Sequence, residues 1–267
     1  MKTFTFLVVL ALTTGLFADQ YNPLKAEEVM VEAVYTAPRG FDDNDSVQLV
    51  LAGKLTNLCY EALNATYKLD KDTNTVTLKQ YAYKHQYPEC NKIEPGNYLG
   101  TSLRFSTVLT LGRLAAGDYR VVFQTPAQGV KAVTFNVAKA SKISIDENLY
   151  APVSSAFIPE VIYETVNAEV VLSGALESTC VTLEAKDIEV IKFKNVIVIL
   201  PKLKVFEGQA CRPTVKPIGE VVSLGKMTEG EYLIHVRTKT GNAINRVFRV
   251  IKDDDDFKGY PDFPPHN

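Results

Sequence analysis

The chain has 267 residues, of which 46% are hydrophobic and 22% are charged, and its formal net charge at pH 7 is −2. That balance offers no basic surface for nucleic acid or for anionic lipid, so we expect no nucleic-acid partner. Tyr and Phe are present 13 times each and Trp is absent. Together with frequent Val and Thr, this composition favours strands over helices.

The first eighteen residues read MKTFTFLVVLALTTGLFA and form a segment of their own. Lys2 precedes an apolar run from Phe4 to Leu12, and small or neutral residues lead to Ala18, which is the layout of a secretory signal. The apolar run is about half the roughly 20 residues that a spanning helix needs. We therefore predict a signal peptide over residues 1–18 and export to the periplasm or the cell exterior, with a retained anchor as the alternative.

Four cysteines and their surroundings reveal an internal repeat. Cys59 and Cys90 are separated by the same number of residues as Cys180 and Cys211. The segment VQLVLAGKLTNLC ends at Cys59, and the related EVVLSGALESTC ends at Cys180. Further on, LAAGDYRVVF (114–123) matches MTEGEYLIHV (227–236), and TFNV (134–137) matches VFRV (247–250). A weaker match pairs VYTAP (34–38) with LYAP (149–152) as first strands.

A duplicated unit of this length predicts two domains, over residues 19–139 and 140–252. An even cysteine count in an exported chain favours disulfides. Because duplication copies an internal bridge together with its fold, we expect one bridge within each copy, Cys59–Cys90 and Cys180–Cys211. Residues 138–142 serve as the linker. The acidic, Pro-containing end, 253–267, lacks the residues for a core and is predicted to be disordered.

The rest of each copy consists of short runs of β-branched and aromatic residues that are separated by turn formers. We predict strands in the first copy at 47–55, 65–69, 75–83, 106–111, 119–124 and 130–137. In the second copy they are predicted at 169–176, 181–185, 189–193, 196–200, 221–224, 232–238 and 243–251. This pattern without helices indicates an all-β fold, with each copy a two-sheet sandwich.

The repeated phrase with Gly117 and Tyr119, and again with Gly230 and Tyr232, resembles the end of immunoglobulin-like and fibronectin-III-like modules. That resemblance implies two tandem sandwiches of this type. In them Tyr119 and Tyr232 are tyrosine corners, whose rings lie in the core and whose hydroxyls bond to backbone. Antibody-like domains carry a cysteine two positions after this tyrosine, where this chain has Val121 and Ile234. The two bridges therefore differ from the antibody disulfide and are expected to join a strand end to a mid-domain loop.

Residues for catalysis and for metal binding are scarce. The three histidines are His85, His235 and His266, and no nucleophile elbow, zinc-binding pair or phosphate loop is present. Asp70, Asp72 and Asn74 alternate as in a calcium loop, but Thr75 replaces the required Gly, so we interpret them as a turn. Two acidic runs, 42–45 and 253–256, are interpreted as solvated loops. We predict no catalytic residue, no metal and no cofactor.

A candidate binding face surrounds the first bridge, where five tyrosines gather in the sequence: Tyr60, Tyr81, Tyr83, Tyr87 and Tyr98. Aromatic rings on a sheet face stack on sugars or fill pockets of a partner protein. The corresponding stretch of the second copy, VIVILPKL, is aliphatic, which suggests a packing face there. The simpler interpretation is that the tyrosines pack the sandwich.

These observations favour a non-enzymatic exported binding or structural module with a protein or glycan partner. The alternative is a protease inhibitor that acts through the loop 91–100, or a hydrolase that uses His85 or His235 in a pocket.

Overall fold

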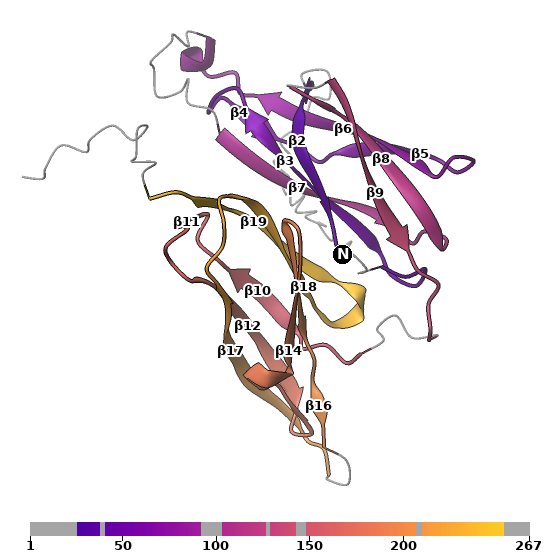
Figure 1. Cartoon of the computed structure of the whole chain (residues 1–267), viewed down its shortest axis with the longest axis vertical. Coiled ribbons are helices and arrows are strands. Elements are labelled where there is room, and N and C mark those ends of the chain that lie inside the picture. The colour runs from indigo at the N-terminus through magenta and orange to yellow at the C-terminus, as the bar shows by residue number, and fades with distance from the viewer. Residues whose placement is uncertain are drawn as a thin grey trace, which may run out of the picture.

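The computed structural model describes residues 26–37, 41–91, 103–126, 129–142, 148–206 and 210–253. Within these residues the chain forms strands joined by turns and short 3₁₀ segments, with no α-helix, so the fold is all-β (Figure 1). The predicted signal peptide, Tyr98, His266, nearly all of the loop 91–100 and nearly all of the tail 253–267 lie outside the described residues.

The first half of the chain contains nine strands in two packed sheets. They are β1 (Ala26–Val29), β2 (Val31–Thr36), β3 (Val47–Leu55), β4 (Tyr60–Ala62), β5 (Thr66–Asp70), β6 (Thr75–Lys84), β7 (Leu103–Gly112), β8 (Gly117–Thr125) and β9 (Gly129–Val137). One sheet has the order β2-β3-β7, and the other has the order β1-β6-β8-β9, with β4 and β5 also paired to β6. Leu49, Leu51, Val76 and Val121 are fully buried in one hydrophobic cluster that both sheets supply.

The second half contains ten strands and a second core. They are β10 (Val153–Phe157), β11 (Val161–Tyr163), β12 (Ala168–Ser178), β13 (Val181–Thr182), β14 (Ile188–Phe193), β15 (Val196–Pro201), β16 (Lys204–Val205), β17 (Pro213–Gly225), β18 (Gly230–Arg237) and β19 (Ala243–Ile251). The sheets are β10-β12-β17 and β11-β19-β18-β15-β14, with β13 paired to β16. Leu172, Ile199, Ile234 and Phe248 lie between the two larger sheets.

The sheet pairings repeat from one half to the other. The order β2-β3-β7 corresponds to β10-β12-β17, and β5-β6-β8-β9 corresponds to β14-β15-β18-β19. Tyr35 of β2 pairs with Val50 of β3, as Phe157 of β10 pairs with Val171 of β12. The predicted match of VYTAP with LYAP is therefore wrong: the counterpart of β2 is β10, and Tyr150 makes only an isolated bridge to Lys202. Alternating patterns this short do not determine which strand is equivalent.

Parallel strand pairings in each half depart from an immunoglobulin sandwich. Strand β6 runs parallel to its neighbour β8 in the first half, and in the second half β15 runs parallel to β18 and β11 runs parallel to β19. Immunoglobulin domains are built from two antiparallel sheets. Each half therefore contains a mixed sheet, and the resemblance is limited to the packing of two sheets and to the tyrosine corners.

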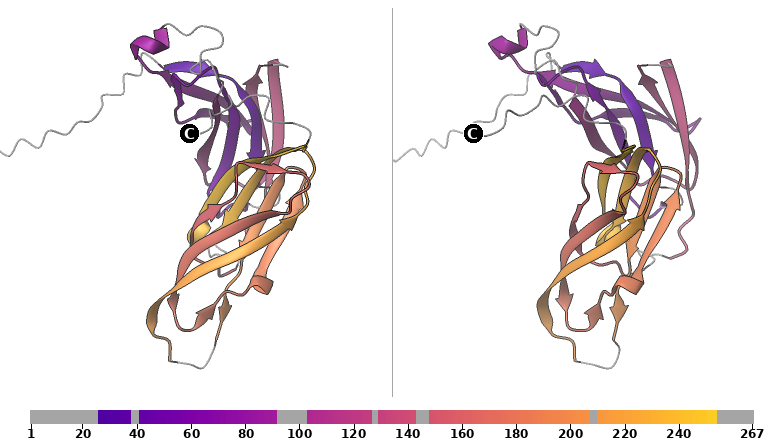
Figure 2. Two further views of the ribbon diagram at one scale, coloured as in Figure 1. Left: turned by 90° about the vertical axis from the view of Figure 1, so that its left-hand side faces the viewer. Right: turned by 60° about the vertical axis from the view of Figure 1, so that its left-hand side comes forward.

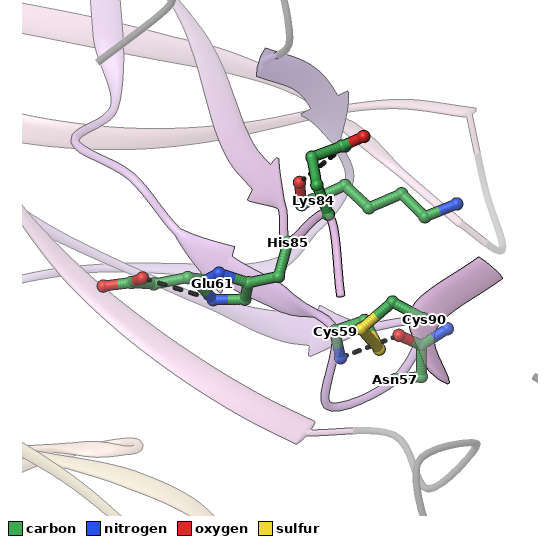
Figure 3. Close-up of a disulfide and its surroundings, with 7 residues drawn as sticks. Asn57, Cys59, Glu61, Lys84, His85 and Cys90 are labelled. Atoms are coloured by element: carbon green, nitrogen blue, oxygen red, sulfur yellow. Dashed lines mark hydrogen bonds and ion pairs between the residues drawn. A yellow bond between two sulfur atoms is a disulfide. The ribbon is translucent and has the colours of Figure 1, made fainter. Parts of the chain in front are cut away.

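Each half carries one disulfide that joins two of its own residues, Cys59–Cys90 and Cys180–Cys211. Cys59 follows β3, and Cys90 lies in the 3₁₀ turn Pro88–Asn91 after β6 (Figure 3). The Cys59 amide donates to Asn57 Oδ1 at 2.9 Å, and the Cys59 carbonyl accepts from the His85 amide at 2.8 Å. The Cys180 carbonyl accepts from the Phe206 amide at the same distance, 2.8 Å. Disulfides of this kind are typical of an oxidising, non-cytoplasmic compartment.

The two repeated tyrosines have equivalent surroundings. The Tyr119 hydroxyl donates to the Ala115 carbonyl at 3.0 Å, and its ring stacks on Phe135 with centroids 5.3 Å apart. The Tyr232 hydroxyl donates to the Thr228 carbonyl at 2.9 Å, and its ring stacks on Phe248 at 5.6 Å. Each tyrosine thus fixes the chain segment that enters the strand before the final hairpin.

We expect Tyr119→Phe and Tyr232→Phe each to lower the free energy of unfolding by about 1 kcal/mol, since each keeps the ring and removes the hydrogen bond from a buried hydroxyl to a backbone carbonyl, and Tyr232→Phe also removes the 3.0 Å contact with Thr228 Oγ1. Urea denaturation measures the loss. Tyr67→Phe is the matched control, because the Tyr67 hydroxyl also donates to a carbonyl, that of Leu111, but the residue is exposed. Its loss should stay below about 0.5 kcal/mol. Equal losses at all three positions would show that the corners have no special role.

The two halves pack against each other (Figure 2), and side chains of β15 and β18 enter the hydrophobic cluster of the first half; we call this contact the joint. The even-numbered residues of β18, such as Ile234, face the core of the second half. The odd-numbered residues of β18 face the first half, and each of them contacts it: Glu231, Leu233, His235 and Arg237. Leu233, Val196 and Val198 belong to the hydrophobic cluster of the first half. Strands β15 and β18 of the second half are therefore buried on both faces.

Polar groups complete this joint. Glu231 accepts a hydrogen bond from the Tyr35 hydroxyl at 2.9 Å, and Asn245 donates to Gln48 Oε1 at 3.0 Å. The predicted linker is held to the first half as well. The Ala140 amide donates to Asp43 Oδ1 at 2.9 Å, and the Asn44 side chain donates to the Lys142 carbonyl at 2.7 Å.

Candidate binding face on strand β6

Strand β6 separates its side chains cleanly between two faces, as the pleat of a strand requires. Val76, Leu78, Gln80 and Ala82 are buried beneath the sheet. Tyr81 and Tyr83 lie on the outer face and are only partly covered. His85 and Tyr87 continue the same alternation beyond the end of the strand. The four side chains Tyr81, Tyr83, His85 and Tyr87 form what we call the aromatic row.

The rings at the end of the aromatic row contact one another. The rings of Tyr83 and His85 meet edge to face with centroids 5.5 Å apart, and His85 stacks on Tyr87 at 5.4 Å with the planes inclined by 19°. Tyr87 is 61% exposed, so one of its faces is available to a partner. The nearby disulfide and the hydrogen bond from His85 to Cys59 hold this segment in place.

Charged groups border the aromatic row on both sides. Glu61 of β4 lies opposite Tyr83 and places a carboxylate oxygen 3.5 Å from His85 Nε2 (Figure 3). Glu28 of β1 lies opposite Tyr81 and accepts a hydrogen bond from Lys79 at 2.7 Å. That hydrogen bond raises the pKa of Lys79 above its usual value. Flat rings with hydrogen-bonding groups at their edges suit a ligand that is both apolar and polar, such as a sugar or a tyrosine-rich peptide.

Tyr60 does not belong to this face. It pairs with Lys84, which lies on the other side of the sheet, and its ring packs against the small core of Leu55, Ala82 and Phe105. Its hydroxyl donates to Glu27 at 3.1 Å, and burial together with that carboxylate raises the pKa of Tyr60. The structure thus brings Tyr81, Tyr83 and Tyr87 together, and it adds His85 and Glu61, which the sequence did not assign to the face.

The second half has no equivalent of the aromatic row. The repeat places Lys202, Lys204 and Phe206 where the first half has Tyr81, Tyr83 and His85. Lys202 and Lys204 form ion pairs with Glu189 at 2.6 Å and Asp187 at 2.9 Å beside a pocket of about 350 Å³. The aliphatic stretch that precedes them, Val196–Ile199, is buried, with Val196 and Val198 in the joint.

The histidines lie in contrasting places. His85 is at the surface beside Glu61, whereas His235 is 3% exposed inside the joint. Burial lowers the pKa of His235 to about 4, and the nearby Arg237 adds to this effect. Two pockets flank the joint. One, of about 390 Å³, lies between β2, β9 and the β14–β15 turn, and the other, of about 120 Å³, lies beside β19. Neither pocket is lined by a histidine.

The acidic segments form turns stabilised by their own side chains. The Asp72 amide donates to Asp70 Oδ1 at 3.0 Å, and the Asn44 amide donates to Asp42 Oδ1 at 2.9 Å. Asp45 instead pairs with Arg237 inside the joint. Among the residues that the structure describes, no three His, Cys, Asp or Glu side chains gather as metal ligands would.

Comparison with protein-family models, with curated proteins and with solved structures gave no match to this chain. In the described part of the chain, no helix is long and apolar enough to cross a membrane. The observations define an all-β protein with two disulfides, which point to an oxidising, non-cytoplasmic environment.

Proposed function

We propose that this chain is an exported, non-enzymatic binding module made of two tandem β-sandwich domains of immunoglobulin-like type, and that it contacts a glycan or protein partner through the aromatic row. The signal-like segment 1–18 and the two disulfides support export. The repeated strand order and the paired tyrosine corners support two related domains.

The observation that carries this proposal is the exposed Tyr87 ring at the end of a row of contacting rings. Buried packing alone does not require tyrosines on the outer face of β6, where the second half has lysines. The row is held on a strand beside a disulfide, so its geometry is fixed before a partner arrives. Pre-formed aromatic anchors lose little conformational entropy on binding.

A glycan array followed by titration calorimetry on the retained sugars tests this function. Tyr83→Ala and Tyr87→Ala should each weaken binding tenfold or more, since truncation of a central aromatic anchor costs more than about 1 kcal/mol. Phe206→Ala is the matched control, because Phe206 is an exposed aromatic at the equivalent place beside the second disulfide. Its affinity should equal that of the unaltered chain.

Protein partners are tested in the same design with an immobilised extract of envelope proteins, with and without Tyr87→Ala. Retention that depends on Tyr87 supports the proposal with a protein partner. Absence of any sugar or protein that is retained through the aromatic row would overturn it.

A further inference from the structure

A second surface emerges when the two halves are compared position by position. In the first half, Tyr35, Val50 and Val108 lie side by side across β2, β3 and β7. In the second half, Phe157, Val171 and Val221 lie side by side across β10, β12 and β17. The two rows occupy the same positions of the repeat, on the outer face of the same sheet, and each consists of one aromatic residue and two valines.

The rows differ in what covers them. Tyr35 and Val50 are 9% and 3% exposed, because Leu233, Val196 and Val198 of the second half pack into the same cluster, whereas Val108 at the end of the row is 47% exposed. Phe157, Val171 and Val221 are 66%, 37% and 55% exposed. The joint therefore shows what this kind of row does within the molecule, which is to bind the face of another sheet. Its counterpart in the second half has no such cover among the described residues.

The exposed row has a charged residue on one side, since Glu169 lies two residues before Val171 on the same face of β12 and is exposed, and small residues on the other side. The next positions across the same face are Ser155, Ser173 and Gly219, and beyond them Ala175 lies opposite Pro217. A Cβ placed on Gly219 would meet nothing, so this part of the sheet is open. Monomeric proteins rarely leave a contiguous apolar patch of this kind uncovered. Small flanking residues allow another sheet to approach closely.

We propose that this face, the outer surface of β10-β12-β17, pairs with the same face of a second copy of the chain to form a two-fold symmetric dimer. The alternative is head-to-tail growth, in which the row of one copy would bind the sheet β1-β6-β8-β9 in the first half of the next copy. That sheet is unsuited to it, because the positions of Val196, Val198 and Leu233 are taken there by Thr75, Thr77 and Arg120, and Arg120 is exposed.

Self-pairing matches the apolar row with its own copy, and the exposed Glu169 lies beside the row rather than within it. A two-fold contact of one patch with itself is also the commonest arrangement of homo-oligomers. The sheet β11-β19-β18-β15-β14 lies between the sheet β10-β12-β17 and the first half. The outer face of β10-β12-β17 is therefore open to a second molecule without rearrangement. The dimer contact does not involve the aromatic row.

Sedimentation velocity of the exported, oxidised chain from micromolar to submillimolar concentration tests this inference. We expect a reversible dimer whose fraction rises with concentration. Val171→Lys and Phe157→Glu should each weaken the dimer at least tenfold, since each places a charge on both sides of the two-fold contact. Val130→Glu is the control, because Val130 is 64% exposed on β9 of the first half, and the dimer should persist.

Tyr83→Ala should leave the dimer unchanged, so that this proposal and the proposed binding function fail independently. A far-UV spectrum and a melting temperature for each variant exclude unfolding as the cause of dissociation. A monomer at every concentration, assemblies that grow without limit, or a dimer unaffected by both charged variants would overturn the proposal.

Discussion

Arg237→Met is expected to lower the free energy of unfolding by about 3–5 kcal/mol, because it leaves the Asp45 carboxylate buried without its counter-ion. The two side chains are 8% and 6% exposed and join the halves across the joint. Asp45 also accepts a hydrogen bond from the Asp42 amide at 3.1 Å, which holds it in place. Burial raises the pKa of Asp45 against the lowering effect of Arg237, so the carboxylate depends on that partner.

Urea denaturation at neutral pH measures this loss, and two further variants identify its cause. The double variant Asp45→Leu/Arg237→Met should recover most of the stability, since a buried ion pair replaced by apolar side chains is often neutral. Lys54→Met breaks a surface pair with Glu32, separated by 3.6 Å, and should cost less than about 1 kcal/mol. A loss in Arg237→Met no larger than that in Lys54→Met would mean that the joint does not depend on the pair.

The strands that the sequence predicts best are those with strong alternation between clear turns. The predicted bounds of β3 and β19 agree with the structure at both ends, and the turn at residues 70–74 separates β5 from β6 as expected. The cysteine pairs are also found within each half. In these cases the information is local, or it is present twice because the chain repeats itself.

Other features depend on contacts between distant segments. The predicted strands contain no counterpart of β1 and β4, which have four and three residues and are defined by pairing with β6. The face occupied by Tyr60 depends on the same register, and a shift of one residue would reverse it. The parallel orientation of β6 beside β8 does not change the alternation of apolar and polar residues in either strand, so the sequence does not reveal it.

The joint was the least predictable part of the molecule. In GEYLIHVR, the sequence of β18, alternation separates Tyr232, Ile234 and Val236 from Glu231, Leu233, His235 and Arg237. The second set is mostly polar, which is typical of a solvated face, and yet it is buried against the first half. The equivalent residues of β8, Asp118, Arg120 and Gln124, are largely open to solvent. Only the three-dimensional arrangement distinguishes these two sets.

Acidification should destabilise the chain through His235. Burial lowers the pKa of His235 to about 4 from the ordinary value of 6.5. Between pH 6.5 and pH 4 the unfolded chain therefore binds a proton at His235 that the folded chain does not bind. The stability that depends on neutral His235 is complete above pH 6.5 and is lost progressively as the pH falls. Near and below pH 4 the accumulated loss amounts to about 3 kcal/mol.

His235→Gln separates this effect from the titration of carboxylates, which is common to both proteins. The substitution removes the ring that contacts Phe41 and accepts or donates the 2.8 Å hydrogen bond to Asn245, so it lowers stability by an amount that does not vary with pH. The unfolding free energy of the variant should nevertheless fall less steeply from pH 6.5 to 4 than that of the unaltered chain. Urea denaturation across this range gives the difference between the two curves. If the two curves converge as the pH falls, the buried imidazole is what makes the contact between the halves sensitive to acid. If the curves stay parallel, protonation of His235 does not contribute to the loss of stability, and the prediction is wrong.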